Sequence, residues 1–104
     1  TANFGSHAKE QFDVLKKYTN GGPLMCMEFW VGWFDSWGAA SHQTGDIENH
    51  GKDLEYILEH GHVNIYMFHG GTNFGFMNGA NYYDELTPDV TSYDYDALLT
   101  EDGE

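Results

Sequence analysis

One carboxylate stands inside an apolar stretch of the sequence. Glu28 follows Leu-Met-Cys-Met and is followed at once by Phe29 and Trp30. Burying an ionised carboxylate is costly unless the group is paired or takes part in chemistry. At the carboxyl end of a buried parallel strand, such a group is typical of a catalytic carboxylate. The alternative is that the strand ends one residue earlier and that Glu28 is solvated.

Aromatic side chains cluster along the chain after this carboxylate. Trp30, Trp33, Phe34 and Trp37 lie within ten residues of it, and aromatic residues make up 16% of the chain. Aromatic side chains can form a core, but they also form sugar-stacking platforms and the apolar walls of ligand pockets. We therefore expect the residues after Glu28 to enclose it.

Three other motifs are weaker evidence for a functional site. Residues 69–75, His-Gly-Gly-Thr-Asn-Phe-Gly, resemble a phosphate loop but lack its Gly-Lys-Ser/Thr ending. His60 and His62 flank a predicted helix end, where a solvated histidine is expected rather than a metal ligand. Asp94 and Asp96 have the spacing of calcium ligands, but the rest of that loop is wrong for an EF-hand, so a solvated acidic face is expected.

The spacing of apolar residues predicts the elements that must position these groups. The predicted elements are a strand end in Thr1–Ser6, a helix over Ala8–Tyr18 capped by Ser6 or His7, a strand over Leu24–Phe29, a helix from a cap at Thr44 or Asp46 to His60, and a strand over Val63–Phe68, with loops from His69 onward. Neither of the two long strands alternates, which indicates burial on both faces and parallel pairing. The fold class is α/β, about a quarter to a third of a barrel of roughly 250 residues.

Composition excludes several classes of function. The 104 residues contain four lysines, no arginine and 17 acids, a formal net charge of −13. Such a chain is repelled by nucleic acids and by anionic membranes. No apolar run approaches the roughly 18 residues of a membrane span. A single cysteine, Cys26, excludes an internal disulfide and is expected to be a buried thiol.

Three blocks of sequence together resemble glycoside hydrolase family 35, the β-galactosidases. Residues 27–38, Met-Glu-Phe-Trp-Val-Gly-Trp-Phe-Asp-Ser-Trp-Gly, resemble the family's nucleophile segment. Residues 64–81 resemble its next strand and loop, and residues 91–97, Thr-Ser-Tyr-Asp-Tyr-Asp-Ala, resemble its substrate-pocket segment. The blocks occur in the family's order and spacing, and the resemblance covers nearly the whole chain.

The resemblance implies a role for four residues. Glu28 would be the nucleophile of a retaining hydrolysis of terminal β-D-galactose, forming a covalent galactosyl-enzyme. Tyr66 would contact the sugar near the nucleophile, Tyr95 would bind galactose hydroxyls, and Trp33 would shape the pocket wall. The substrate would be a β-galactoside, with no cofactor and no metal. From the residues alone, Tyr66, Tyr95 and Trp33 could equally be packing residues.

One catalytic group of the family has no counterpart here. The acid/base in family 35 is the Glu of an Asn-Glu pair, and no Asn-Glu dipeptide occurs in this chain. We therefore expect residues 1–104 to be a fragment of a single catalytic barrel domain, a partial TIM (β/α)8 barrel of about the last two or three βα units, inactive without the rest. The opening at Thr1 is typical of a fragment or processed product.

Two alternatives remain open at this point. One is a non-catalytic galactose-binding relative or remnant, and the other is an acidic, calcium-binding interaction module. The linkage preference, the oligomeric state and the compartment are left open, a cytoplasmic parent being one option.

Overall fold

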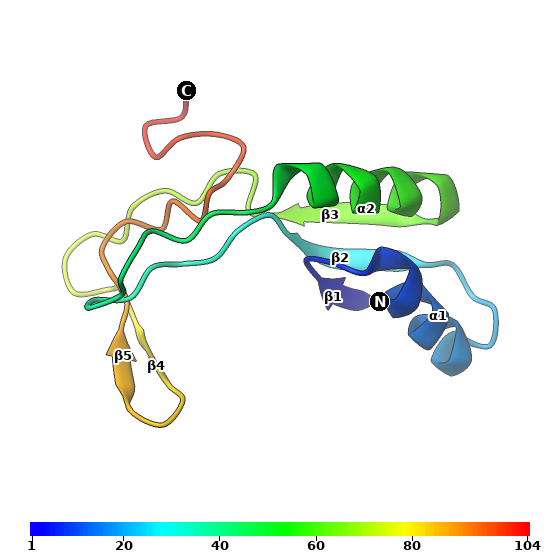
Figure 1. The fold of residues 1–104 in the computed structure, drawn as a ribbon, viewed down its shortest axis with the longest axis horizontal. Coiled ribbons are helices and arrows are strands. Elements are labelled where there is room, and N and C mark those ends of the chain that lie inside the picture. Colours follow the sequence, from blue (N-terminus) through cyan, green and yellow to red (C-terminus); the bar gives the residue numbers. More distant parts are fainter. The chain divides into compact units, whose positions relative to one another are not determined.

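The computed structural model describes all residues from Thr1 to Glu104, and they form two compact units (Figure 1). Unit 1 consists of residues 1–31 and 45–66, and unit 2 consists of residues 32–44 and 67–104. None of the helices has the length and apolar character that crossing a membrane requires.

Unit 1 is a three-stranded parallel sheet whose strands are connected by helices (Figure 1). Its elements in chain order are β1 (Ala2–Phe4), α1 (Ala8–Thr19), β2 (Met25–Trp30), α2 (Ile47–His60) and β3 (His62–Tyr66). The strands are adjacent in the order β1-β2-β3, and both pairs are parallel. The predicted helices, strands and parallel pairing are confirmed, and so is the α/β class.

Both helices contribute to one core on one face of this sheet. The core residues are Phe4, Ala8, Phe12, Leu15, Leu24, Cys26, Phe29 and Ile57. Phe12 of α1 is fully buried and meets the ring of Phe4 edge-on at 5.6 Å between centroids. The expected burial of both faces is not observed, since Met27 is 43% exposed and β3 has no buried residue. The two helices of unit 1 pack against only one face of its sheet.

The N-termini of the two helices are capped in different ways. Asp46, one of the two predicted caps of α2, accepts a hydrogen bond from the backbone N–H of Asn49 at 3.1 Å. The side chain of His7 makes no capping bond to α1, so the predicted side-chain cap is wrong. Asp53 of α2 replaces it by accepting from the backbone N–H groups of His7 and Ala8, at 3.1 and 2.8 Å. A cap can therefore come from a distant element, which local sequence does not reveal.

Gly61 ends α2 for reasons of space. Its φ of −169° is extended backbone, which any residue can adopt. A Cβ at this position would lie 2.6 Å from the carbonyl oxygen of Leu24, immediately before β2. The glycine therefore lets the end of α2 approach the start of β2 closely.

Unit 2 is mostly irregular, with one short hairpin. Strands β4 (Ala80–Tyr82) and β5 (Leu86–Pro88) pair antiparallel, in a region expected to be loop. Isolated bridges also join Ser36 to Asp89, Thr72 to Ser92 and His69 to Leu99. The hairpin lacks a long alternating apolar pattern because its strands have only three residues each.

Candidate functional site

Glu28 lies near the carboxyl end of β2 and is half-buried. Its Oε2 accepts a hydrogen bond from the indole Nε1–H of Trp30, two residues further along, at 3.0 Å. Residues two apart on a strand point to the same side, which brings these two side chains together. The carboxylate is thus neither fully buried nor simply solvated, because an indole donor orients one of its oxygens.

A β-bulge determines which way Glu28 points. Cys26 pairs with Val63 and Phe29 pairs with Ile65, so two residues of β2 stand opposite the single Asn64 of β3. Cys26 and Phe29 are both buried in the core, although residues three apart on a regular strand face opposite sides. The bulge resolves this conflict, as bulges near active sites do when they re-aim a side chain.

The side chain of Asn64 stabilises the bulge. Its Nδ2 donates to the carbonyl oxygen of Met27 at 3.0 Å. The bulge interrupts the regular ladder, and this hydrogen bond gives the Met27 carbonyl a partner at that point. Asn64 therefore acts on the backbone immediately before Glu28.

Tyr66 is the last residue of β3 and is half-buried. It pairs with Trp30 of β2, and its carbonyl oxygen accepts from the backbone N–H of Val31 at 3.2 Å. Unit 1 therefore brings two of the four predicted site residues, Glu28 and Tyr66, to the carboxyl ends of adjacent parallel strands.

Unit 2 brings together the other two predicted site residues, Trp33 and Tyr95. Their ring centroids are 6.0 Å apart, and Tyr93 stacks on Tyr95 at 5.4 Å. Tyr95 is only 2% exposed, whereas Trp33 is 39% exposed. A Cβ on Gly32 would overlap the carbonyl oxygen of Tyr95, so the two segments contact each other at the backbone. The predicted nucleophile and pocket segments thus meet through residues 32–33 and 93–95.

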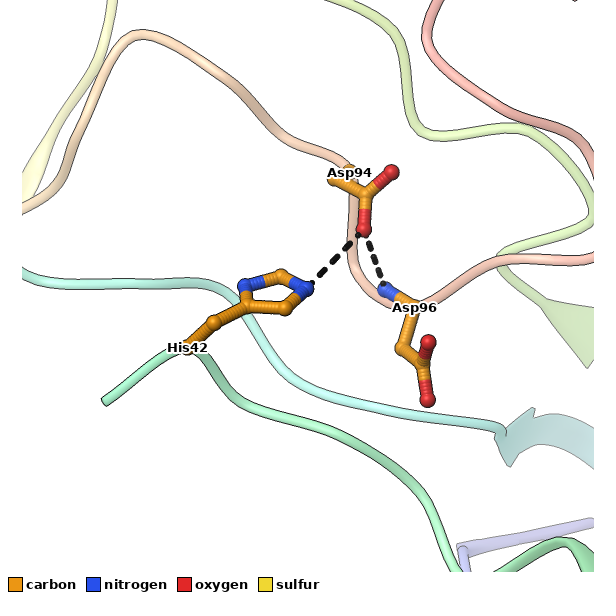
Figure 2. Close-up of side chains that lie close together, drawn as sticks. All are labelled: His42, Asp94 and Asp96. Carbon is orange, nitrogen blue, oxygen red and sulfur yellow. Dashed lines mark hydrogen bonds and ion pairs between the residues drawn. The ribbon is translucent and has the colours of Figure 1, made fainter.

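A charged cluster that the sequence did not reveal joins His42 to Asp94 and Asp96, the two chain neighbours of Tyr95 (Figure 2). His42 Nδ1 donates to Asp35 Oδ2 at 2.5 Å, and His42 Nε2 lies 3.4 Å from Asp94 Oδ2. The hydrogen bond to Asp35 raises the pKa of His42, and the charges of Asp35, Asp94 and Asp96 raise it further. The Asp94/Asp96 spacing was a usable signal, but no pattern connects these residues to His42.

The acidic C-terminal segment is more structured than the expected solvated face. Glu101 accepts hydrogen bonds from the hydroxyls of Thr72 and Ser92, and these bonds lower the pKa of its carboxyl. Asp89 is half-buried, and burial raises the pKa of its carboxyl. Acidic side chains therefore hold loops of unit 2 together.

Two residues outside the site fit the expectations for them. Cys26 is fully buried, and desolvation raises the pKa of its thiol, which makes it an unreactive core residue. His60 is exposed at the carboxyl end of α2, where its Nδ1 lies 2.8 Å from the carbonyl oxygen of Tyr56.

Comparison with known proteins connects this arrangement to a family. The sequence model described as Glycosyl hydrolases family 35 matches residues 1–104. A human protein named Beta-galactosidase-1-like protein 3 is 50% identical over 96 residues, covering 92% of this chain and 15% of that protein. The Beta-galactosidase of Xanthomonas manihotis is 50% identical over 101 residues, covering 92% of this chain and 17% of that protein. The Beta-galactosidase of the dog is 46% identical over 107 residues, covering 100% of this chain and 16% of that protein.

The chain spans about a sixth of the length of these curated relatives. The family model nevertheless covers every residue that the structure describes, including both units. The resemblance to this family is thus confirmed, and the chain belongs to glycosyl hydrolases family 35.

Proposed function

We propose that residues 1–104 are the nucleophile-bearing segment of a longer retaining β-galactosidase, called the parent protein below. Relatives that are 46–50% identical carry the name Beta-galactosidase, which supports galactosides as the substrate class. In this proposal the segment forms about the last two or three βα units of a single catalytic (β/α)8 barrel.

The topology of unit 1 supports the barrel. Its parallel strands are adjacent in chain order, and the connecting helices α1 and α2 contribute to one core. A doubly wound sheet reverses its strand order and places helices on both faces, whereas a barrel keeps the order and places every helix outside. The uncovered face of the sheet, with Met27 exposed, would then be the barrel interior.

The position of Glu28 is the observation that carries the proposal. A half-buried carboxylate lies at the carboxyl end of a parallel strand, where barrel enzymes hold their catalytic residues, and a bulge sets its direction. The indole of Trp30 donates to Oε2, and no hydrogen bond within the chain involves Oε1. One oxygen is thus oriented while the other remains able to attack.

The proposed reaction proceeds in two steps. A Glu28 oxygen attacks the anomeric carbon of the galactoside and forms a C–O bond as the bond to the aglycone breaks. The leaving oxygen takes a proton from a carboxylic acid elsewhere in the parent protein, about 5–5.5 Å from Glu28 in a retaining enzyme. Water, deprotonated by the same group, then releases galactose with its configuration retained.

Three aromatic residues would form the galactose side of the site. Tyr66 is the last residue of β3, the strand next to the bulged β2, and would contact the sugar near Glu28. Tyr95 would donate and accept hydrogen bonds to galactose hydroxyls, and Trp33, which packs beside it, would form part of the pocket wall. None of these roles calls for a metal or a cofactor.

The test removes the nucleophile from the parent protein. Glu28→Gln should lower the rate of aryl β-galactoside cleavage by about a thousandfold or more, since the covalent step loses its nucleophile. The matched control is Glu55→Gln, an exposed carboxylate on α2, which should leave the rate within about twofold. A loss of less than about tenfold for Glu28→Gln would contradict the assignment.

A second variant separates chemistry from folding. Glu28→Ala leaves space at the anomeric carbon, and added azide should restore cleavage and yield α-galactosyl azide, because the small anion attacks from the vacated side. If the parent protein cleaves the galactoside but Glu28→Ala yields no galactosyl azide, the nucleophile is another residue. A parent that binds galactose but cleaves no galactoside would be the non-catalytic galactose-binding relative instead.

A further inference from the structure

The basic side chains are unevenly divided between the two units. All four lysines, Lys9, Lys16, Lys17 and Lys52, lie in unit 1, which also has eight acids and therefore a formal charge of −4. Unit 2 has nine acids and neither lysine nor arginine, a formal charge of −9. Its only side chains that can carry positive charge are His42 and His69.

Of these two histidines, His42 lies among several carboxylates. Figure 2 shows its ring directed towards Asp94, with Asp96 close by. On its other side, Nδ1 donates to Asp35, whose second oxygen accepts from the backbone N–H of Gln43 at 2.8 Å. An imidazolium at this position offers one N–H to each flanking carboxylate and offsets their mutual repulsion.

The same carboxylate that faces His42 also holds the backbone of Tyr95. Asp94 Oδ2 accepts from the backbone N–H of Asp96 at 3.1 Å (Figure 2). Tyr95 and Asp96 are two successive residues with left-handed backbone, at φ 62° and 50°. Non-glycine residues in this region are strained and persist only where their surroundings fix them. The hydrogen bond across Tyr95 is one such restraint, and the orientation of Asp94 decides whether it forms.

We propose that protonated His42 is a positioning residue, which links Asp35 to Asp94 and thereby fixes the left-handed Tyr95 in the galactose subsite. This inference rests on the proposed function, since Tyr95 is the residue through which His42 acts. His42 need not touch the sugar, and its contribution is to hold the Tyr95 ring against Trp33 and Tyr93.

The cluster has one competing interpretation. A ring nitrogen of His42 and one carboxylate oxygen each of Asp94 and Asp96 all lie within 4.8 Å of one another, a grouping that a divalent cation could join. Asp35 would then be the outer carboxylate that orients the ligating histidine. Metal ligation requires neutral His42, whereas the proposed link requires the imidazolium, so the two interpretations differ in proton content and in metal dependence.

The experiment is a double-mutant cycle in the parent protein with an aryl β-galactoside. His42→Gln should raise KM and the inhibition constant of galactose by about fivefold or more, and should change kcat less. In a Tyr95→Phe background, the same change should raise these two constants by less than about a further twofold. A residue that acts through Tyr95 has little further effect once the Tyr95 hydroxyl is gone. His62→Gln, an exposed histidine on β3, is the matched control and should leave both constants unchanged.

Three outcomes would overturn the proposal. Unchanged galactose affinity in His42→Gln would show that the link does not reach the sugar site. Full additivity of His42→Gln and Tyr95→Phe would indicate a general structural role. If EDTA abolishes activity and added zinc or manganese restores it, a bridging metal rather than the imidazolium holds the cluster together.

A second readout does not depend on catalysis. Hydrogen–deuterium exchange of the peptide covering residues 91–97 should speed up in His42→Gln and in Asp35→Asn, because the Asp96 N–H loses its oriented acceptor. The wild-type protection should fall as pH rises through the raised pKa of His42, and His42→Gln should remove that dependence. If the parent protein cleaves no galactoside, the proposed function is wrong, but this exchange measurement still tests the link from Asp35 through His42 to Asp94. Unchanged exchange in both variants would refute that link.

Discussion

The two units of this chain are held together by different interactions. Unit 1 contains eight of the nine buried hydrophobic residues, and they form one core between two helices and a sheet. Unit 2 contains only Tyr95. Stacked rings, isolated bridges and hydrogen bonds to carboxylates take the place of a core. A family 35 chain thus combines a region whose fold follows from apolar burial with a region that depends on specific polar contacts.

This difference separates the proposed catalytic roles. The proposed nucleophile Glu28 lies in unit 1, on a strand whose neighbours are fixed by the core. The proposed sugar-binding residue Tyr95 lies in unit 2, where its backbone is strained. Residues on loops held by a rigid scaffold commonly determine binding, while strand ends in barrels supply catalytic groups. Damage to unit 1 should therefore abolish folding, and damage to unit 2 should first alter substrate affinity.

The largest expected effect comes from opening the core of unit 1. Phe12→Ala should lower the free energy of unfolding by about 3–5 kcal/mol, because Phe12 is fully buried and contacts the rings of Phe4 and Tyr56. Urea unfolding of the parent protein measures the loss. Tyr18→Ala, on the same helix but 85% exposed, is the control and should cost less than about 0.5 kcal/mol. Equal losses for the two variants would refute the comparison.

The elements of unit 1 could be predicted because their apolar periodicity reflects the core that forms. The predicted strand over residues 24–29 is observed at Met25–Trp30, and the helix ending at His60 ends there. The bulge at Met27 and Glu28 could not be predicted, because it depends on which side chains the helices bury. The same holds for Asp53 as the cap of α1, a contact between residues 45 apart.

Unit 2 shows where sequence patterns give less information. The family resemblance, not periodicity, predicts that residues 91–97 belong to the site. Neither the pairing of His42 with Asp94 nor the hydroxyl partners of Glu101 follows from local spacing, since these contacts join distant loops. Polar contacts in loops depend on the tertiary path of the chain, which propensities do not encode.

A smaller effect should follow from filling a close backbone contact in unit 2. Gly32→Ala would place a Cβ over the carbonyl oxygen of Tyr95 and 2.9 Å from the Cβ of Asp96. Backbone atoms cannot rotate away, so we expect a local loss of about 1–3 kcal/mol in the opening free energy of residues 91–97. Native-state hydrogen exchange measures it, together with an increase in KM for the galactoside.

Gly51 supplies the matched control for that substitution. It lies inside α2, and a Cβ there would meet no atom within 4 Å. Gly51→Ala should therefore stabilise unit 1 by about 0.4–1 kcal/mol, since alanine is the better helix former. A Gly32→Ala variant as stable as Gly51→Ala would mean that residues 32 and 95 do not approach as the structure shows.

The smallest effects should appear as opposite pH responses of the two units. Hydrogen bonds from Asn49 lower the pKa of Asp46, so its contribution to α2 is present above the ordinary carboxyl pKa of about 4. That contribution is lost as pH falls through the lowered value. The hydrogen bond to Asp35 raises the pKa of His42, so its contribution to unit 2 is present below the ordinary histidine pKa of about 6.5. That contribution is lost as pH rises through the raised value.

Exchange protection factors, corrected for intrinsic rates, can separate these responses in the parent protein. The first turn of α2 should lose protection on acidification, and residues 91–97 should lose it in mild alkali. Asp46→Asn should retain the cap while flattening the acid response, because asparagine caps helices without titrating. His42→Gln should flatten only the alkaline response. If both segments lost protection in the same pH range, a common opening would govern them, and the two units would not respond independently.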